Sequence, residues 1–340
     1  MYMINHPRMT LPHVVYLLVV QNSFADTIWN TGINLGYLPE VNISDLSPRS
    51  FFDKYQRVPF VFRSFQDSLS TLADSQHFSD SIEWLRMKLG DDSTADSVEG
   101  ELHETRLAPT IRKVKWKYFL EKFKKMDIYA VTQAPEALRT YLKLMPVISC
   151  GGIHDRMVAP HIWVSGGVRS SRSVVHMDSY ANQHCILKGH KRFLLIPPNA
   201  PITTREYGWV ETDTDDKPEG FENAYGAFFG EVDTENMDLD RFPKWKDVPW
   251  FEADLREGDC LYMPEGWFHY VESEPEITVS WHQWFNIPEK WREEDSCDKS
   301  ETVKLTTAQC VYSNDKHRPT KRQTIDWSSY DDRKSVCYTQ

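Results

Sequence analysis

The chain has 340 residues, of which 40% are hydrophobic and 13% aromatic, so it can form a sizeable core in one large domain or two smaller ones. Its 50 acidic and 39 basic residues give a formal net charge of -11, which argues against binding nucleic acid by neutralising phosphates. The chain has six cysteines but no CxxC pair, so the cysteine spacing excludes a zinc ribbon and does not indicate a disulfide scaffold.

Residues 1–25 allow two interpretations. Arg8 precedes an apolar run over 11–20, and Ser23-Phe24-Ala25 resembles a signal-peptidase site, an order typical of a secretory signal peptide. A chain that enters the ER lumen can also be glycosylated at the sequon that begins at Asn42. Alternatively, this segment is an N-terminal extension, or the first strand or helix, of a cytoplasmic or nuclear protein. No apolar run is long enough to predict a transmembrane helix.

The N-terminal half is predicted to alternate helices with short strands. Ser47 and Pro48 indicate a helix start, because Pro is accepted in the first turn. The acidic stretch over 91–104 contains few apolar residues and is predicted to be a surface loop. The apolar spacing predicts helices over 49–55, 81–89, 114–123 and 134–145, and strands over 58–62, 127–133 and 161–164.

From residue 174 onward the pattern changes to short apolar strands separated by Gly and Pro turns. Strands are predicted over 174–177, 185–187, 192–196, 260–263, 267–271 and 276–285. Such a series is typical of an antiparallel barrel or sandwich. Cys185 and Cys260 fall within these strands, where we expect free thiols that pack as small hydrophobic residues.

An acidic insertion over 199–249 interrupts the series of strands. Its acidic residues, such as Asp215 and Asp216, are interleaved with aromatic residues such as Tyr225. Runs of charge are usually solvated, which favours a surface loop, while a substrate-facing lid for basic peptides is the functional alternative. After the last strand, the polar tail over 291–340 is expected to be helical or loosely ordered. Its cysteines are expected to pair only in an oxidising compartment; they are Cys297, Cys310 and Cys337.

Two residues of metal-binding type, His176 and Asp178, lie two positions apart in an apolar, alternating stretch. Side chains two apart in a strand share a face, so both can reach one ion. The best candidate for a third ligand is His269, in the segment GDCLYMPEGWFHYVES. Two imidazoles and one carboxylate leave several coordination positions open, as in the facial triad of non-haem Fe(II) oxygenases.

Other interpretations of these residues remain open at this point. His176 and Asp178 could be hydrogen-bonded core residues, because His-x-Asp is common by chance. A zinc site would usually recruit Cys or a third His, for which His184 and His190 are near in sequence. Lys191 favours Fe(II), because a cation placed behind a Gly turn can bind the far carboxylate of a dicarboxylate cosubstrate.

An ordered series of segments resembles the JmjC-domain (cupin-like) Fe(II)/2-oxoglutarate-dependent oxygenases, in their group of small protein hydroxylases. The segments are SFFDKYQRVPFVFRSF, VKWKYFLEKF, DIYAVTQ, HIWVSGG, the block from HMD to LKGHKRFLLIPP, and LREGDCLYMPEGWFHYVES. The resemblance implies a mainly β fold with flanking helices, a double-stranded β-helix (jelly roll). The catalytic domain is expected over 42–290, with helical additions at both ends.

The resemblance also implies roles for individual residues. His176, Asp178 and His269 would hold Fe(II), and no catalytic residue is expected beyond this metal centre. Around the cosubstrate 2-oxoglutarate, the predicted residues are Lys191, Tyr129 and Ser173 at the C5 carboxylate, and Asn182 and Ser280 beside it. Some relatives have Thr in place of Ser173 and Asn in place of Ser280. The tryptophans near these residues are expected to pack as hydrophobic core or at the barrel mouth; they are Trp163, Trp267, Trp281 and Trp284.

The activity implied by the resemblance is hydroxylation of a side chain of a protein or peptide substrate, with O2 as oxidant. The acidic composition fits a basic substrate and makes nucleic acid an unattractive partner. N-methyl-lysine or arginine demethylation and RNA hydroxylation are alternatives within the superfamily, and a non-catalytic binding scaffold is an alternative of another class. Relatives often dimerise through C-terminal helices, which makes a homodimer a further expectation.

Overall fold

This computed structural model describes most of the chain between residues 31 and 290. The described ranges are 31–91, 93, 95, 97–100, 114–122, 128–150, 152–167, 170–178, 180–200, 209–211, 228–230 and 237–290, with short strands at 303–304, 309–311 and 336–338. The segment predicted as a signal peptide, Cys297 and most of the tail over 291–340 lie outside these ranges. Within them, no helix has the length and apolar character needed to cross a membrane.

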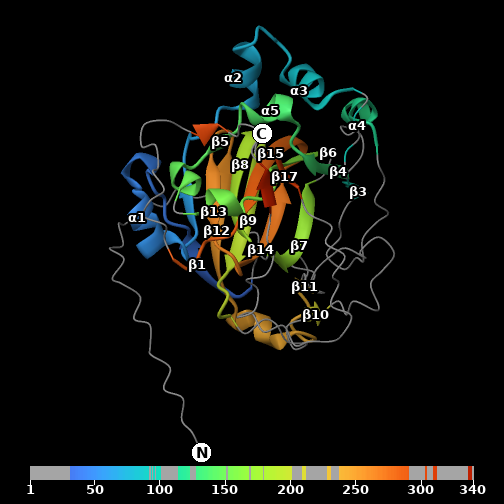
Figure 1. The fold of residues 1–340 in the computed structure, drawn as a ribbon. Helices are drawn as coiled ribbons and strands as arrows, with labels where there is room; N and C mark the ends of the chain where they lie inside the picture. Colours follow the sequence, from blue (N-terminus) through green and yellow to red (C-terminus); the bar gives the residue numbers. More distant parts are fainter. Residues whose placement is uncertain are drawn as a thin grey trace, which may run out of the picture. The chain divides into compact units, whose positions relative to one another are not determined.

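Two seven-stranded sheets form the centre of the fold (Figure 1). The first sheet has the strand order β1 (Ile33–Tyr37), β12 (Pro249–Arg256), β9 (His190–Ile196), β14 (Phe268–Ser273), β7 (Ser171–Met177), β11 (Phe228–Gly230), β10 (Trp209–Glu211). The second has the order β2 (Phe60–Phe62), β13 (Cys260–Met263), β8 (Ala181–Lys188), β15 (Glu276–Phe285), β6 (His161–Gly167), β4 (Ile128–Gln133), β3 (Ser97–Gly100).

The chain alternates between the two sheets as it proceeds. Strands β7 and β9 lie in the first sheet while β8 lies in the second, and β12 to β15 alternate in the same way. Both sheets are antiparallel in their described pairings, apart from the parallel pairing of β1 with β12. This winding confirms the predicted jelly roll.

The helices cover the outer face of the second sheet (Figure 1). They are α1 (Pro48–Ser50), η2 (Phe51–Tyr55, a π-helix), α2 (Leu69–Asp74), α3 (Ser81–Leu89), α4 (Trp116–Lys122) and α5 (Glu136–Arg139). Trp84 and Trp116 from these helices are fully buried in one cluster with Trp281 of β15. Asp80 caps α3 by accepting hydrogen bonds from two backbone N–H groups of its first turn. No helix occurs among the described residues after 290.

A second hydrophobic cluster fills one side of the space between the two sheets. Phe193 and Leu195 of β9 pack there with Ile186 of β8 and Leu261 of β13. Side chains alternate along a strand, so the same inner faces also carry Lys191 and His184. The rings of His184 and Phe193 meet edge to face across the sheets, with centroids 5.1 Å apart. The space between the sheets therefore also contains buried polar side chains.

Two predictions about secondary structure were wrong. The segment over 91–104, predicted as a loop, contributes strand β3, which pairs with β4. The helix predicted over 134–145 ends at Arg139 and is followed by strand β5 (Lys143–Leu144) and a 3-10 helix, η4 (Pro146–Ser149). The backbone of Lys143 is held instead by two distant side-chain amides, since its N–H donates to Gln66 and its carbonyl accepts from Gln183.

Cys185 and Cys260 form a disulfide, so the expectation of two free thiols was wrong. The residues are direct register partners on β8 and β13, and both are fully buried in the layer between the second sheet and the helices. They are 75 positions apart in the sequence, and only the crossover between the sheets brings them together.

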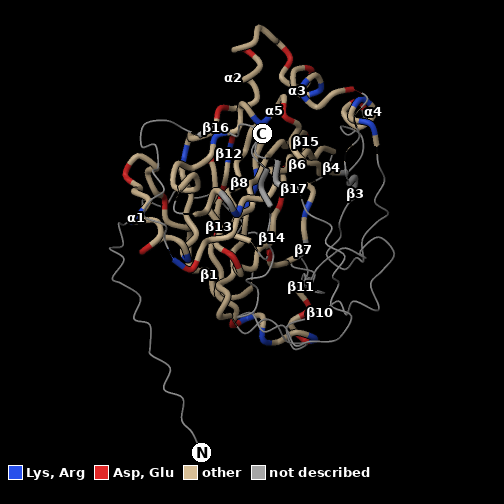
Figure 2. Tube along the Cα trace, viewed as in Figure 1, with Lys and Arg blue, Asp and Glu red and all other residues tan. Residues whose placement is uncertain are grey.

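Charged residues of both signs are interspersed along the described chain (Figure 2). On the outer face of the first sheet they form cross-strand ion pairs, Arg172 with Glu272 at 3.4 Å and Arg192 with Glu252 at 3.1 Å. These pairs stabilise the contacts between neighbouring strands, and each places a positive charge beside a negative one on this face of the sheet.

Candidate metal centre

Three residues of metal-binding type converge where β7 and β14 lie side by side. His176 of β7 and His269 of β14 are direct register partners, and Asp178 follows the end of β7. One ligand atom from each of the three lies within 4.8 Å of the others. Nε2 of His269 is 3.8 Å from Oδ2 of Asp178, less than twice a metal–ligand distance of about 2.1 Å, so one ion can contact both.

Hydrogen bonds orient two of these three side chains. Nδ1 of His269 lies 3.2 Å from the carbonyl oxygen of Trp267, so Nδ1–H donates there and the lone pair of Nε2 faces Asp178. The indole N–H of Trp284 donates to Oδ2 of Asp178 at 3.2 Å. Partners of this kind fix the tautomer and the position of metal ligands.

Burial is the largest influence on the pKa values of two of these side chains, His269 and Asp178. It lowers the pKa of His269 well below the usual value, and the nearby His176 adds to the effect. It also raises the pKa of Asp178, although His176 and the hydrogen bond from Trp284 act in the opposite direction. Neutral imidazoles are the form that binds a metal, and a cation would compensate the buried carboxylate.

Lys191 extends from β9 into the interior and is only 6% exposed. Burial lowers its pKa to about 7, and no described carboxylate forms an ion pair with it. Its Nζ lies 5.8 Å from the centroid of the Trp163 ring, and that ring stacks on Tyr129 at 5.8 Å. Lys191 and Tyr129, both predicted at the cosubstrate carboxylate, thus both lie beside Trp163.

The other predicted cosubstrate residues supply buried polar atoms. The Oγ atoms of Ser173 and Ser280 and Oδ1 of Asn182 are buried and find no hydrogen-bond partner among the described residues. Buried polar atoms are rarely left without a partner, so each of these three atoms is a candidate for contact with a polar ligand.

Two histidines beside this group were not predicted as site residues. His282 is the register partner of His184, and both lie on the inner face of the second sheet. Burial is the main cause of the lowered pKa of each histidine, and the nearby Lys191 and His269 lower it further. Trp163, predicted as core, donates from its indole N–H to Nδ1 of His282 at 2.8 Å. The strand alternation of His282 with Ser280 was the sequence signal for this placement.

Strand β11, which belongs to the acidic insertion, adjoins the metal-binding strand. It pairs with β7 so that Phe229 lies opposite His176, and β10 pairs with its other edge. Part of the insertion thereby extends the first sheet beside the triad. The expectation of a surface loop without strands was wrong for these six residues.

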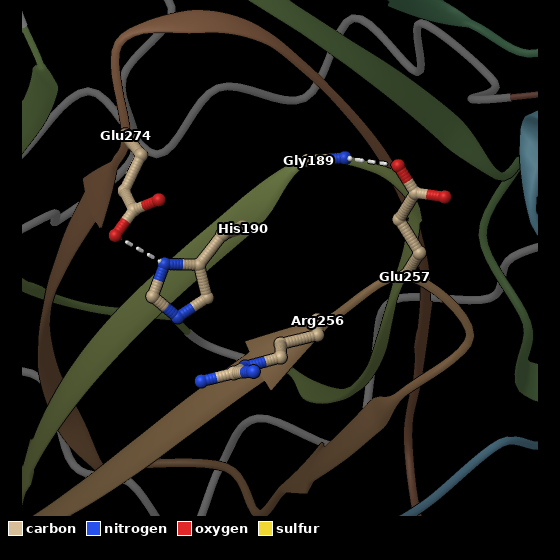
Figure 3. Close-up of a pocket in the computed structure, with 5 residues that line it drawn as sticks. All are labelled: Gly189, His190, Arg256, Glu257 and Glu274. Carbon is tan, nitrogen blue, oxygen red and sulfur yellow. Dashed lines mark hydrogen bonds and ion pairs between the residues drawn. The ribbon is translucent and has the colours of Figure 1, made fainter.

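A separate surface pocket of about 380 Å³ lies at the other face of β9 (Figure 3). His190 and Arg256 line it with two carboxylates, and Glu274 accepts a hydrogen bond from the His190 ring. His190 precedes Lys191 in the same strand, so their side chains point to opposite faces. The pocket is therefore not part of the triad's surroundings.

Comparison with known proteins identifies the domain type. A family model described as a cupin-like domain matches residues 48–290. Human HSPB1-associated protein 1 is 28% identical over 130 residues, covering 38% of this chain and 24% of the relative. Jumonji C domain-containing protein 5 of Drosophila melanogaster is 31% identical over 115 residues, covering 34% of this chain and 25% of the relative.

A third relative carries an activity in its name. The human bifunctional peptidase and (3S)-lysyl hydroxylase JMJD7 is 28% identical over 127 residues, covering 34% of this chain and 37% of the relative. In each of these three proteins the aligned segment is well under half of the full length.

Proposed function

The chain belongs to the cupin-like domain family, and on that premise we propose that it is an Fe(II)- and 2-oxoglutarate-dependent oxygenase that hydroxylates a side chain of a protein substrate. The observation that carries the proposal is the combination of the triad His176, Asp178 and His269 with Lys191, which is buried and has no carboxylate partner among the described residues. We further propose that the catalytic domain spans residues 42–290.

The residues present fit Fe(II) and 2-oxoglutarate. Two imidazoles and one carboxylate suit Fe(II), and they approach from one side, which leaves coordination positions open. Lys191 is a buried cation, and Ser173, Asn182 and Ser280 hold buried polar atoms without partners among the described residues. A dicarboxylate would supply acceptors for the ammonium of Lys191 and for the hydroxyls of Ser173 and Ser280, since a buried charge is stable only when paired. Oδ1 of Asn182 is itself an acceptor and would instead need a donor.

Each part of the chain has a distinct task in this proposal. Bound Fe(II) and 2-oxoglutarate would supply the activation of O2, with release of succinate and CO2 as one oxygen atom enters a C–H bond of the substrate. Trp267 and Trp284 keep His269 and Asp178 in the orientation that binds the ion. Lys191 anchors the far carboxylate, and the cluster around Phe193 excludes water from one side.

A protein substrate is supported by two features. One relative is named as a lysyl hydroxylase, so hydroxylation of a protein side chain is an activity found among similar sequences. The acidic insertion over 199–249 contributes strand β11 beside His176, and its acidic composition favours a basic peptide as substrate. Demethylation would use the same oxidation, applied to a C–H bond of an N-methyl group, and is the alternative activity for this site.

The test is an anaerobic titration of the purified protein with Fe(II) and 2-oxoglutarate, following the visible charge-transfer band of the chelate. We expect a band in the wild type, no band in Asp178→Ala, and a much higher 2-oxoglutarate requirement in Lys191→Ala. Asp53→Ala and Lys54→Ala change exposed residues of the same types and serve as matched controls. A folded wild type without a band would instead indicate a binding scaffold or another metal.

A further inference from the structure

We propose that His282 is a cosubstrate-binding residue, whose Nε2–H donates to the far carboxylate of a 2-oxo dicarboxylate next to Lys191. The inference rests on the proposed function and adds a specificity-determining residue to it. Together, the two donors would select a 2-oxo acid with a second carboxylate over one that ends in a methyl group.

The tautomer of His282 follows from one hydrogen bond. The indole nitrogen of Trp163 can only donate, and it lies 2.8 Å from Nδ1 of His282. Nδ1 must therefore accept, which places the ring proton of a neutral imidazole on Nε2. Burial favours the neutral form, since it lowers the pKa of His282 well below the usual value, and the neighbouring His161 adds to this effect.

The proton on Nε2 has no acceptor in the described part of the structure. His282 is 2% exposed, and its Nε2 is buried without a hydrogen-bond partner. A buried donor without a partner destabilises the protein, and a bound acceptor would remove this cost. A carboxylate oxygen is the acceptor that forms the strongest hydrogen bond with such a donor.

Trp163 places this donor at the Lys191 end of the site. The Trp163 ring lies 5.6 Å from the His282 ring and 5.8 Å from Nζ of Lys191, measured to ring centroids. His184, whose ring lies 6.2 Å from that of His282, has a second buried Nε2 without a described partner. Trp163 thus borders both the ammonium of Lys191 and the ring of His282, and in this proposal the ammonium and the Nε2–H act as a pair of donors for one carboxylate.

The experiment compares the binding of 2-oxoglutarate by the full chain loaded with Mn(II), measured by calorimetry. His282→Phe removes the donor, while His282→Gln keeps an N–H near the position of Nε2. We expect His282→Phe to bind at least about tenfold more weakly, the loss typical of one hydrogen bond to a charged group, and His282→Gln to keep most of the affinity. Affinity for Mn(II) itself should stay unchanged in both variants.

The outcomes separate this inference from the proposed function. A wild type that does not bind 2-oxoglutarate would overturn both, whereas a wild type that binds it no better than His282→Phe would overturn the role of His282 alone. Equal losses in the Phe and Gln variants would show that ring shape rather than the donor matters, and would also overturn it.

A second measurement does not depend on a variant that folds. Nitrogen-15 NMR of Zn(II)-loaded, histidine-labelled wild type should show His282 protonated on Nε2, with this proton moving downfield when 2-oxoglutarate is added. A proton on Nδ1, or an unchanged signal on saturation with 2-oxoglutarate, would contradict the proposal.

Discussion

The indole nitrogen of Trp284 lies 3.2 Å from Oδ2 of Asp178 and donates a hydrogen bond to it. The two residues are 106 positions apart in the chain, and the pairing of β15 with β8 brings them together. The tryptophan therefore does more than pack at the mouth of the barrel. It holds the carboxylate of the triad in place.

Replacing Trp284 with Phe should weaken metal binding by about 10- to 100-fold, the usual effect of losing a partner of a metal ligand. The phenyl ring keeps most of the packing but cannot donate to Asp178. Titration with Mn(II), followed by electron paramagnetic resonance, measures the change. Trp281→Phe is a matched control, because Trp281 faces the helices and should affect stability but not metal affinity. Equal affinity in Trp284→Phe and the wild type would contradict the prediction.

The affinity for 2-oxoglutarate should fall as the pH rises above neutral. Burial lowers the pKa of Lys191 to about 7, so its charged form is complete below that value and is lost above it. Because the charged form binds the carboxylate, the affinity should drop by up to about tenfold per pH unit above pH 7. Calorimetry across this range tests the slope, and Lys191→Met should bind weakly with little pH dependence. A flat wild-type profile would show that Lys191 does not anchor the ligand.

His190 should stabilise the fold in mildly acidic solution. Its two ring nitrogens face carboxylates, Nε2 at Asp254 and Nδ1 at Glu274, 2.6 Å from Oε1. Burial lowers the pKa of His190, but the hydrogen bonds to the two carboxylates outweigh it, so the pKa is raised. Burial raises the pKa of Asp254, but the interaction with His190 outweighs it, so that pKa is lowered. The ion pairs of His190 therefore contribute fully to the free energy of unfolding between about pH 4 and 6.5. This contribution is lost as the pH rises through the raised pKa of His190.

The variant His190→Gln tests this contribution. It should reduce the free energy of unfolding by about 1 kcal/mol at about pH 5.5, since the ion pairs are partly exposed, and by less at about pH 9. Urea unfolding at both pH values gives the difference between wild type and variant. A difference that does not change with pH would show that the charge on His190 does not contribute.

The disulfide between Cys185 and Cys260 should make stability sensitive to reductant. It closes a loop across 75 positions, for which the entropy of the unfolded chain predicts a contribution of about 4 kcal/mol. Guanidinium unfolding of the wild type and of the double variant Cys185→Ala/Cys260→Ala, both without reductant, measures it. Cys150 is also disulfide-bonded, so the double variant should respond to reductant less strongly than the wild type. A non-reduced peptide map without the linked pair would contradict the bond. Its presence in cells would support folding in an oxidising compartment.

Elements with a clear local pattern could be predicted from the sequence. Strand β15 and helix α3 have the predicted bounds, because alternation and helical spacing are properties of neighbouring residues. His176 and Asp178 were predicted to reach one ion from a single strand, but β7 ends at Met177 and Asp178 lies just beyond it, while both still belong to the triad. The identity of the metal and the roles of the cosubstrate residues stay predictions.

Features that depend on the pairing of distant strands could not be predicted. The register of β8 with β13 decides that Cys185 meets Cys260, and the register of β15 with β6 decides that Trp163 reaches His282. Likewise, the helix expected after Ala134 ends early because the distant Gln66 and Gln183 satisfy the backbone of Lys143. No local spacing carries such information.

The placement of β11 against β7 has a consequence for how such proteins diverge. Phe229 lies opposite His176, so a segment that interrupts the series of strands rejoins the sheet beside a residue of the His-Asp-His triad. A descendant that keeps this short pairing can lengthen, shorten or recharge the sequence on either side of it while the ligand geometry stays the same. On the proposed function, a change of protein substrate would then need changes in the insertion alone, with the triad unaltered.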